Sequence, residues 1–125
     1  MATPIISVVD DDHSVRESLA RLIRSVGFGV QVFESAEAFL SSGCLDDGDT
    51  DCLILDIRMP GMNGLELQRL LSARDTDLPV IFITAHGSDD EVRARALGAG
   101  AVDYLLKPLK EEEVLKAIDA ALSSE

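Results

Sequence analysis

The sequence predicts an α/β fold built on a doubly wound, five-stranded parallel sheet. Five short apolar runs, at residues 5–9, 30–33, 52–55, 79–84 and 102–106, alternate with five stretches whose apolar residues recur at helical spacing. The runs are almost continuously apolar, which is typical of parallel strands that are covered by helices on both faces. Right-handed crossovers between such strands produce a doubly wound sheet.

The first half of the chain supplies two predicted strand–helix units and a loop. Residues 5–9 form the first strand, and the helix that follows ends at Gly27. The apolar face of this helix consists of Val15, Leu19, Leu22, Ile23 and Val26. After the strand at 30–33, Ser35 is a suitable N-cap for a short helix with apolar Ala36, Phe39 and Leu40. Residues 43–51 are polar and acidic, and we expect a loop there.

The second half supplies three further units. The strand at 52–55 ends at Asp56, and the sequence Met-Pro-Gly-Met-Asn-Gly at 59–64 predicts a turn-rich loop. The helix at 65–74 directs Leu67, Leu70 and Leu71 inward. After the strand at 79–84, Ser88-x-x-Glu91 predicts a capping box for a fourth helix that closes near Gly98 or Gly100. After the strand at 102–106 and Pro108, the last helix carries apolar Val114, Leu115, Ile118, Ala121 and Leu122.

Length and charge restrict the class of protein. The 125 residues have the size of one domain, and the net charge of −12, with a pI of about 4.4, argues against binding to nucleic acid or to an anionic membrane. No apolar run approaches the ~20 residues of a membrane helix and no signal peptide is visible, so we expect a cytoplasmic protein. Cys44 and Cys52 have no metal-ligand spacing and are expected to be reduced thiols. The acidic segment 47–51 does not begin a calcium-binding loop, because such a loop has glycine at its sixth position, which is absent here, and glutamate at its twelfth, where this chain has Arg58.

Three consecutive acids, Asp10, Asp11 and Asp12, directly follow the first predicted strand. Two carboxylates about 5 Å apart repel each other by roughly 3 kcal/mol at an effective dielectric constant near 20. A fold that retains such a cluster usually holds a divalent cation there, and hard oxygen ligands favour Mg²⁺, Mn²⁺ or Ca²⁺. The acidic turn therefore predicts a metal site at the end of the first strand.

Three further polar residues, Asp56, Thr84 and Lys107, stand at or just after the ends of other predicted strands. Doubly wound sheets bind ligands at the carboxyl ends of their strands, so the topology gathers these residues beside the acidic turn. A carboxylate can attack phosphorus when a metal ion neutralises the charge, and a hydroxyl and an ammonium group can hold the phosphoryl oxygens. Each of these residue types is common at a strand end when it occurs alone, but their occurrence together at the carboxyl ends of the strands predicts a phosphoryl-transfer site.

Four segments resemble the receiver domain of bacterial two-component response regulators, and the resemblance covers essentially the whole chain. They are Val8-Val9-Asp10-Asp11-Asp12, Leu55-Asp56-Ile57-Arg58-Met59-Pro60-Gly61-Met62-Asn63-Gly64, Ile83-Thr84-Ala85 and Tyr104-Leu105-Leu106-Lys107-Pro108. The segments Ser35-Ala36-Glu37-Ala38-Phe39-Leu40, Thr84-Ala85-His86-Gly87 and Gly98-Ala99-Gly100-Ala101 look most like the FixJ/NarL-type branch. The resemblance implies a flavodoxin/CheY-like (βα)5 fold of strand order 2-1-3-4-5, with residues 1–125 as one receiver domain.

The resemblance also implies the chemistry of the site. Asp56 would be the phosphoacceptor, taking a phosphoryl group from a phosphohistidine of a sensor histidine kinase. Asp11, Asp56 and the backbone carbonyl of Arg58 would bind Mg²⁺, for which Mn²⁺ can substitute, and Asp10 would reach the metal through water. Lys107 would pair with the phosphoryl group.

The resemblance further implies a conformational switch. Thr84 would move toward the phosphoryl group, Ala85 would leave that group approachable, and the Lys107–Pro108 peptide bond would be cis. Tyr104 would turn inward with Thr84 and couple the site to the face formed by the fourth helix, the fifth strand and the fifth helix. Phosphorylation would drive homodimerisation through that face and control transcription through a DNA-binding output domain absent from this chain. Such a protein is a signalling switch, not an enzyme, although it catalyses its own phosphorylation and slow dephosphorylation.

Other functions are weighed against this one. Asp10-Asp11-Asp12-His13-Ser14 resembles the opening motif of haloacid-dehalogenase-like phosphatases, with Asp10 as nucleophile and Asp12 as general acid, but this leaves Asp56 unexplained. A flavodoxin-like electron carrier needs a phosphate-binding loop where the three acids stand. A binding-only pseudo-receiver would normally lack an acid, the threonine or the lysine, and this chain has all of them. The roles of Asp12 (helix cap or contact with a metal-bound water) and of His86 stay open, as does the kinase.

Overall fold

Strands and helices alternate along the chain as predicted. The computed structural model describes residues 3–74, 77–85 and 90–123. Within this part, the strands are β1 (Ile5–Val9), β2 (Gly29–Phe33), β3 (Cys52–Asp56), β4 (Val80–Thr84) and β5 (Asp103–Leu106). The helices are α1 (His13–Ser25), α2 (Ala36–Ser41), α3 (Gly64–Ala73), α4 (Asp90–Gly98) and α5 (Glu111–Ser123).

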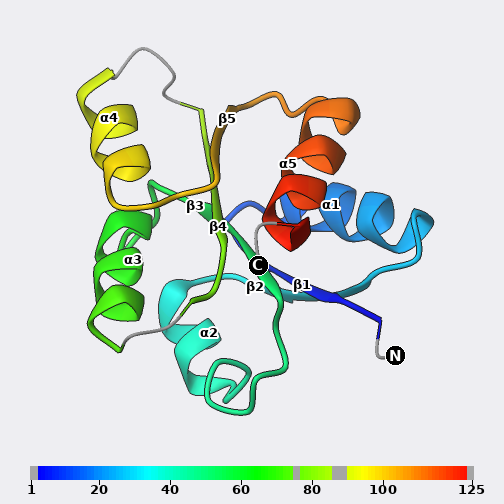
Figure 1. Ribbon diagram of the computed structural model, residues 1–125, viewed down its shortest axis with the longest axis horizontal. Helices are drawn as coiled ribbons and strands as arrows, with labels where there is room; N and C mark the ends of the chain where they lie inside the picture. Colours follow the sequence, from blue (N-terminus) through cyan, green and yellow to red (C-terminus); the bar gives the residue numbers. More distant parts are fainter. Residues whose placement is uncertain (1–2, 75–76, 86–89, 124–125) are drawn as a thin grey trace.

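The strands form one parallel sheet of order β2-β1-β3-β4-β5 (Figure 1). Strand β1 pairs on one side with β2, where Ile6 lies opposite Val30, and on the other side with β3, where Ile6 lies opposite Cys52. The direction of winding therefore reverses between β1 and β3, and the carboxyl ends of these strands flank the switch point where ligands bind in such sheets. The predicted doubly wound fold and its strand order are confirmed.

Helices cover both faces of the sheet, with α1 and α5 on one face and α2, α3 and α4 on the other (Figure 1). Successive side chains of a strand point to opposite faces. A sheet that helices cover on both faces therefore needs apolar side chains at nearly every strand position, which explains the continuous apolar runs. The core beneath α1 and α5 includes Ile6, Val8, Leu19, Ile23, Ile54, Ile81, Ile83, Val114 and Ile118. The core beneath the other three helices includes Val9, Phe39, Leu53, Leu55, Leu67, Leu71, Phe82 and Ala96.

The end of α1 differs from the prediction that placed Val26 on its buried face. Val26 is the C-cap residue and is 44% exposed, so that prediction is wrong. The N–H groups of Gly27 and Phe28 turn back to the carbonyls of Arg24 and Ile23, at 3.0 Å and 3.3 Å. Gly27 has a φ of +93°, which a residue with a side chain rarely adopts. This turn moves the chain off the helix axis, and Phe28 packs against the core instead.

The other predicted boundaries lie close to the observed ones. β4 starts at Val80 because Pro79 has no N–H to donate to a ladder, and β5 starts one residue later than predicted, at Asp103. Ser88, the cap of the predicted capping box, lies outside the described residues. Glu91 makes a 3.0 Å ion pair with Arg95 within α4. No helix in the described ranges is long and apolar enough to cross a membrane.

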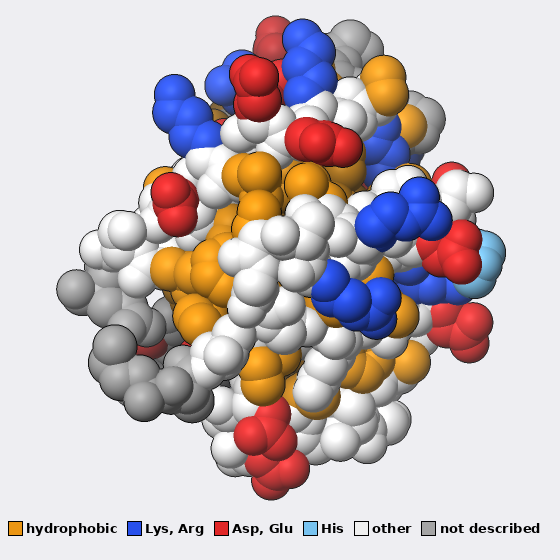
Figure 2. All heavy atoms as spheres, turned by 90° about the vertical axis from the view of Figure 1, so that its right-hand side faces the viewer, with side chains coloured by type: hydrophobic (Ala, Val, Ile, Leu, Met, Phe, Trp, Pro, Cys, Tyr) orange, Lys and Arg blue, Asp and Glu red, His pale blue; other side chains and the backbone are white. Residues whose placement is uncertain are grey.

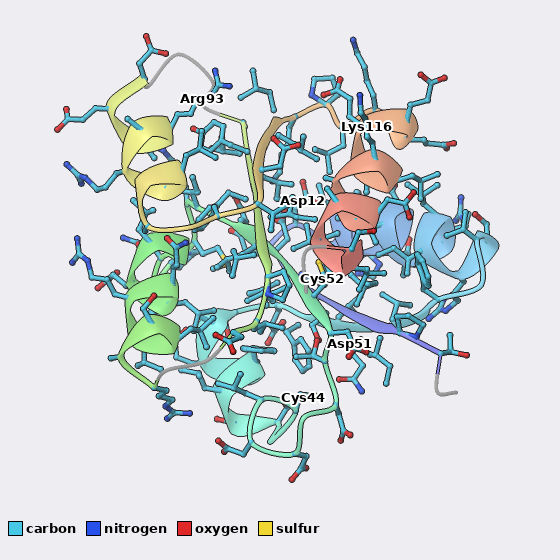
Figure 3. All side chains as sticks on the ribbon, in the orientation of Figure 1. Asp12, Cys44, Asp51, Cys52, Arg93 and Lys116 are labelled. Atoms are coloured by element: carbon cyan, nitrogen blue, oxygen red, sulfur yellow. The ribbon has the colours of Figure 1, made fainter. Side chains whose placement is uncertain are left out.

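Both cysteines are free and buried, in agreement with the sequence. Figure 3 shows them in separate places, with Cys44 in the loop after α2 and Cys52 at the start of β3. Burial raises the pKa of Cys52 to about 12, and the negative charge of Asp51 adds to the rise. Cys52 is therefore an inert thiol of the core near neutral pH.

Candidate functional site

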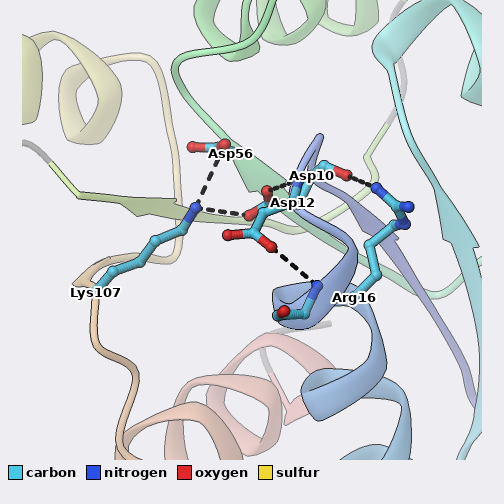
Figure 4. A network of polar contacts seen from close by, with 6 residues as sticks. Asp10, Asp12, Arg16, Asp56 and Lys107 are labelled. Atoms are coloured by element: carbon cyan, nitrogen blue, oxygen red, sulfur yellow. Dashed lines mark hydrogen bonds and ion pairs between the residues drawn. The ribbon is translucent and has the colours of Figure 1, made fainter.

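The parallel strands bring the predicted site residues to one edge of the sheet. Asp10 follows β1, Asp56 and Thr84 are the last residues of β3 and β4, and Lys107 follows β5. Asp10, Asp56 and Thr84 are 0%, 3% and 1% exposed, whereas Asp11 lies on the surface. Figure 4 shows the side chains of Asp10, Asp56 and Lys107 converging from three strands. The structure thus assembles the constellation that the sequence predicts.

Hydrogen bonds fix the acidic turn between β1 and α1. The N–H of Asp12 donates to Oδ1 of Asp10 at 2.8 Å, and Oδ1 of Asp12 accepts the N–H of Ser14 at 2.9 Å. Asp12 is therefore the N-cap of α1, which is the first of the two roles that the sequence leaves open. The carbonyl oxygen of Asp10 accepts a 2.7 Å hydrogen bond from Nη1 of Arg16 (Figure 4).

Arg16 is a neighbour of the site that the sequence motifs do not indicate. A signal was nevertheless present, because side chains of a helix slant toward its N-terminus. An arginine in the first turns of α1 can therefore reach back to the turn that precedes the helix. Its hydrogen bond holds the backbone of Asp10 and leaves the two carboxylate oxygens of Asp10 for other partners.

One ammonium group faces two buried carboxylates. Nζ of Lys107 lies 2.9 Å from Oδ2 of Asp10 and 3.5 Å from Oδ2 of Asp56. The Lys107–Pro108 peptide bond is cis, as the resemblance implies. Within the described part of the chain, Oδ2 of Asp10 has this ion pair and no further hydrogen-bond donor. Since a carboxylate oxygen has two lone pairs, this buried atom retains capacity for another positive group.

The electrostatics of the site oppose the charge on Asp56. Burial raises the pKa of Asp56 to about 7, and the negative charge of Asp10 adds to the rise. The charge of Lys107 and the backbone N–H of Arg58 act in the other direction. Burial also opposes the charge of Lys107, but the hydrogen bond and charge of Asp10, together with Asp56, outweigh it and raise the pKa of Lys107. An added cation would favour the charged form of Asp56.

The carboxylates are arranged so that they can share such a cation. Asp10, Asp11 and Asp56 each offer one oxygen atom, and these oxygens lie within 4.8 Å of one another. A set of carboxylate oxygens suits the hard divalent ions Mg²⁺ and Mn²⁺. The raised pKa of Asp56 and the spare capacity of Asp10 fit a positive ion at this place.

The two predicted switch residues lie on neighbouring strands and share one face of the sheet. In the register of β4 with β5, Phe82 lies opposite Tyr104 and Thr84 lies opposite Leu106. Residues two apart on a strand point to the same face, so Thr84 and Tyr104 both face the layer that contains α4. Tyr104 is buried in the core on that side. The predicted loop residue His86 lies outside the described residues.

Two of the grooves in the described part of the chain are lined in part by Lys107. One, of about 380 Å³, runs between α1 and α5 and is lined by Val15, Leu22, Lys107 and Leu109 among others. Figure 2 shows hydrophobic side chains gathered between charged ones on the face formed by these helices. The other, of about 390 Å³, lies on the α4–β5–α5 side and includes Arg93, Tyr104, Leu106, Lys107, Lys110 and Glu113. A partner seated in either groove would lie next to Lys107.

Sequence comparisons identify close relatives. The response regulator protein TodT of Pseudomonas putida is 47% identical over 118 residues, which cover 94% of this chain and 51% of TodT. The transcriptional regulatory protein FixJ of Azorhizobium caulinodans is 44% identical over 118 residues, which cover 94% of this chain and 54% of FixJ. The chain therefore spans about half the length of the curated relatives it matches.

Comparisons with solved structures and with a family model point to the same kind of protein as the sequence relatives. The crystal structure of FixJ-N superposes with a TM-score of 0.88 at 38% identity, covering 100% of this chain and 98% of that chain. The low-resolution structure of the response regulator StyR gives a TM-score of 0.86 at 48% identity, covering 97% of this chain and 60% of that one. The family model of the response regulator receiver domain matches residues 6–119. The chain belongs to the family of response regulator receiver domains.

Proposed function

We propose that Asp56 accepts a phosphoryl group from a sensor histidine kinase and that this modification switches the conformation of the domain. The observation that carries the proposal is the charge arrangement at Asp56. This buried carboxylate lies beside two others that can share a cation with it, and an ammonium group lies 3.5 Å away. A carboxylate and a phosphoryl group repel each other, so transfer between them needs positive charge at both. Membership in the receiver family supports the same chemistry.

The transfer itself would be an in-line substitution at phosphorus. An oxygen of charged Asp56 would attack the phosphorus atom of a phosphohistidine, and the P–N bond would break with its electron pair going to the imidazole nitrogen. Asp11, Asp56 and the carbonyl oxygen of Arg58 would hold Mg²⁺, or Mn²⁺ in its place, with Asp10 reaching it through water. When bound, the ion supplies the positive charge that the approach of two anions requires. Slow hydrolysis of the acyl phosphate would return Asp56 to its starting state.

Lys107 and Thr84 would hold the transferred group. The ammonium of Lys107 would pair with one phosphoryl oxygen in place of Asp56, and the hydroxyl of Thr84 would donate to another. Because Thr84 and Tyr104 share one face of the sheet, a shift of Thr84 would be passed to Tyr104 and to the α4–β5–α5 face. That face has an exposed Leu106 beside its groove. We therefore propose it as the interface of a phosphorylation-dependent homodimer.

The output is proposed from the relatives. FixJ carries the name of a transcriptional regulatory protein, and this chain spans about half of it. We propose that residues 1–125 are the receiver domain of a cytoplasmic transcription regulator. With a net charge of −12, the receiver domain itself does not suit DNA, so DNA contact would belong to a separate output domain. The receiver acts as a signalling switch whose catalysis is limited to its own phosphorylation and dephosphorylation.

Intact mass spectrometry after incubation with Mg²⁺ and acetyl phosphate tests this function without requiring the kinase. We expect a labile gain of about 80 Da, one phosphoryl group, that does not form when EDTA is present during the incubation. A wild-type protein that binds Mg²⁺ and takes up no phosphoryl group from this donor or from phosphorylated kinases would instead be a binding-only member of the family.

A further inference from the structure

The loop that follows Asp56 is held from outside the site by a glutamate of α2. Oε2 of Glu37 accepts the N–H of Met62 at 3.0 Å, across a sequence separation of 25 residues. The same oxygen lies over Gly61, whose φ is +76°, and a β-carbon at Gly61 would come within 2.7 Å of it. The missing side chain at Gly61 is thus what allows Glu37 to approach the apex of the loop.

The base of the same loop is fixed by its own backbone. The N–H of Ile57 extends the β3–β4 ladder to the carbonyl of Ile83 at 3.1 Å, and the N–H of Gly64 donates to the carbonyl of Ile57 at 2.9 Å. A β-carbon on Gly64 would lie 2.5 Å from the carbonyl oxygen of Asp56, so α3 begins directly against the end of β3. The loop therefore has a backbone anchor at its base and a side-chain anchor, Glu37, at its apex.

The segment between these anchors reaches the reacting carboxylate. The backbone N–H of Arg58 interacts with Asp56, and the carbonyl of Arg58 is the metal ligand proposed above. Met59 is buried and Met62 is partly buried in the core beneath α2 and α3. With both ends and these side chains held, the peptide groups around Arg58 have little freedom relative to Asp56.

We infer that Glu37 is a positioning residue for the phosphorylation site: by holding the loop apex at Met62, it keeps the peptide groups of Arg58 aimed at Asp56 and at the metal position. This inference rests on the proposed function of Asp56. Groups that support a metal ligand from outside commonly change affinity or activity by about tenfold or more when they are removed. The anchor is available near neutral pH, because the hydrogen bonds from the N–H of Met62 and from the N–H of Glu37 itself lower the pKa of Glu37.

Two substitutions of Glu37 remove the same charge but differ in whether they keep the hydrogen bond to Met62, so together they distinguish the effect of the hydrogen bond from that of the charge. Glu37→Gln removes the charge and keeps an oxygen that can accept the N–H of Met62, whereas Glu37→Ala removes both. Glu34→Ala is the matched control, because it removes an equal charge from an exposed glutamate three residues earlier. Three quantities are measured for each: hydrogen exchange of the Met62 and Arg58 amides, Mg²⁺ affinity by calorimetry, and the rate of phosphorylation by acetyl phosphate. The urea midpoint reports overall stability.

We expect Glu37→Ala to speed exchange of both amides about tenfold and to weaken Mg²⁺ binding and slow phosphorylation about fivefold to tenfold. The urea midpoint should change little, and Glu37→Gln and Glu34→Ala should stay within about twofold of wild type. Equal losses in Glu37→Ala and Glu37→Gln, or unchanged Mg²⁺ affinity and rate in Glu37→Ala, would overturn the inference. A wild-type protein without phosphoryl uptake would contradict the proposed function, and amide exchange together with Mg²⁺ affinity would still decide the role of Glu37.

Discussion

Asp56 makes its own contribution to the pH dependence of the stability of the metal-free protein. Its pKa rises from the ordinary value of 3.8 to about 7 in the folded protein, because burial and Asp10 oppose its charge. Between these two values the folded protein binds the proton more tightly than the unfolded chain. The stabilisation from this group is therefore complete below about pH 4 and is lost as the pH rises through about 7.

Asp56→Asn should remove this dependence. Without Mg²⁺, we expect the variant to unfold with a free energy about 4 kcal/mol above that of wild type at pH 8, because the pKa of Asp56 is raised from 3.8 to about 7, and the difference should vanish near pH 4. Urea unfolding across this range measures it. Asp119→Asn, on the exposed side of α5, should stay within about 0.5 kcal/mol of wild type throughout. A difference between Asp56→Asn and wild type that is constant with pH would contradict the electrostatic description of the site.

Lys107 should matter for stability as well as for chemistry. Lys107→Ala leaves the buried carboxylate of Asp10 without its ion pair, and removing one partner of a buried pair is strongly destabilising. We expect a loss of about 2–4 kcal/mol at pH 8 in EDTA, partly restored by Mg²⁺. The exposed Lys110, which lies 3.9 Å from Glu113, provides the control, since Lys110→Ala should change stability by less than about 1 kcal/mol. Equal effects of the two substitutions would show that the pair with Asp10 carries no special energy.

Among the helices, α4 has the fewest buried residues in the part of the chain that the structure describes. In the described residues it buries Ala96 alone, whereas α1 buries three side chains and α5 buries four. Helices with few buried contacts open locally at low free energy. We expect the amides of α4 to exchange about tenfold faster than those of α5 in the unphosphorylated protein, as measured by hydrogen exchange with NMR or mass spectrometry. Protection of α4 equal to that of α5 would contradict the expectation that a helix with one buried residue opens more easily.

The sequence predicts the elements well for a physical reason. Strands covered on both faces must be apolar at every position, so their runs stand out, and parallel strands put their carboxyl ends at one edge. This is how Asp10, Asp56 and Lys107 could be brought together before the structure was known. Val26 was misplaced although the sequence predicts that the helix ends at Gly27, because the C-cap residue has already left helical geometry and its side chain no longer continues the apolar face.

The supporting contacts of the site could not be predicted in the same way. The hydrogen bond from Met62 to Glu37 depends on how α2 lies against a loop 25 residues later, and no periodicity encodes that distance. The direction of helical side chains indicates that Arg16 can reach back to the acidic turn, but its acceptor there is the backbone carbonyl of Asp10, which no motif specifies. Motifs therefore indicate the reacting groups, and the structure is needed to find what holds them in place.

At the scale of the whole molecule, Mg²⁺ binding, proton binding and folding should be linked. The metal needs deprotonated carboxylates, and the pKa of Asp56 is about 7, so Mg²⁺ affinity should fall as the pH drops below about 7. We expect saturating Mg²⁺ to raise the free energy of unfolding by about 2–3 kcal/mol at pH 8 and by much less at pH 5.5.

Two variants of the acidic turn serve as controls for this measurement of the Mg²⁺-dependent stabilisation. Asp11→Asn should lose most of the increase because Asp11 belongs to the group that can share a cation. Asp12→Asn should keep it, because Asp12 caps α1 and asparagine caps equally well. An increase that is independent of pH, or one that Asp12→Asn abolishes, would contradict the assignment of the metal site.

The measurement that tests the central claim most directly is the identity of the phosphorylated side chain. After reaction with Mg²⁺ and acetyl phosphate, reduction of the acyl phosphate with borohydride marks the acceptor, which peptide mass spectrometry then locates. We predict the mark at Asp56 in the wild type and no mark in Asp56→Asn. A mark at Asp10, or one that persists in Asp56→Asn, would contradict the assignment of Asp56 as the acceptor.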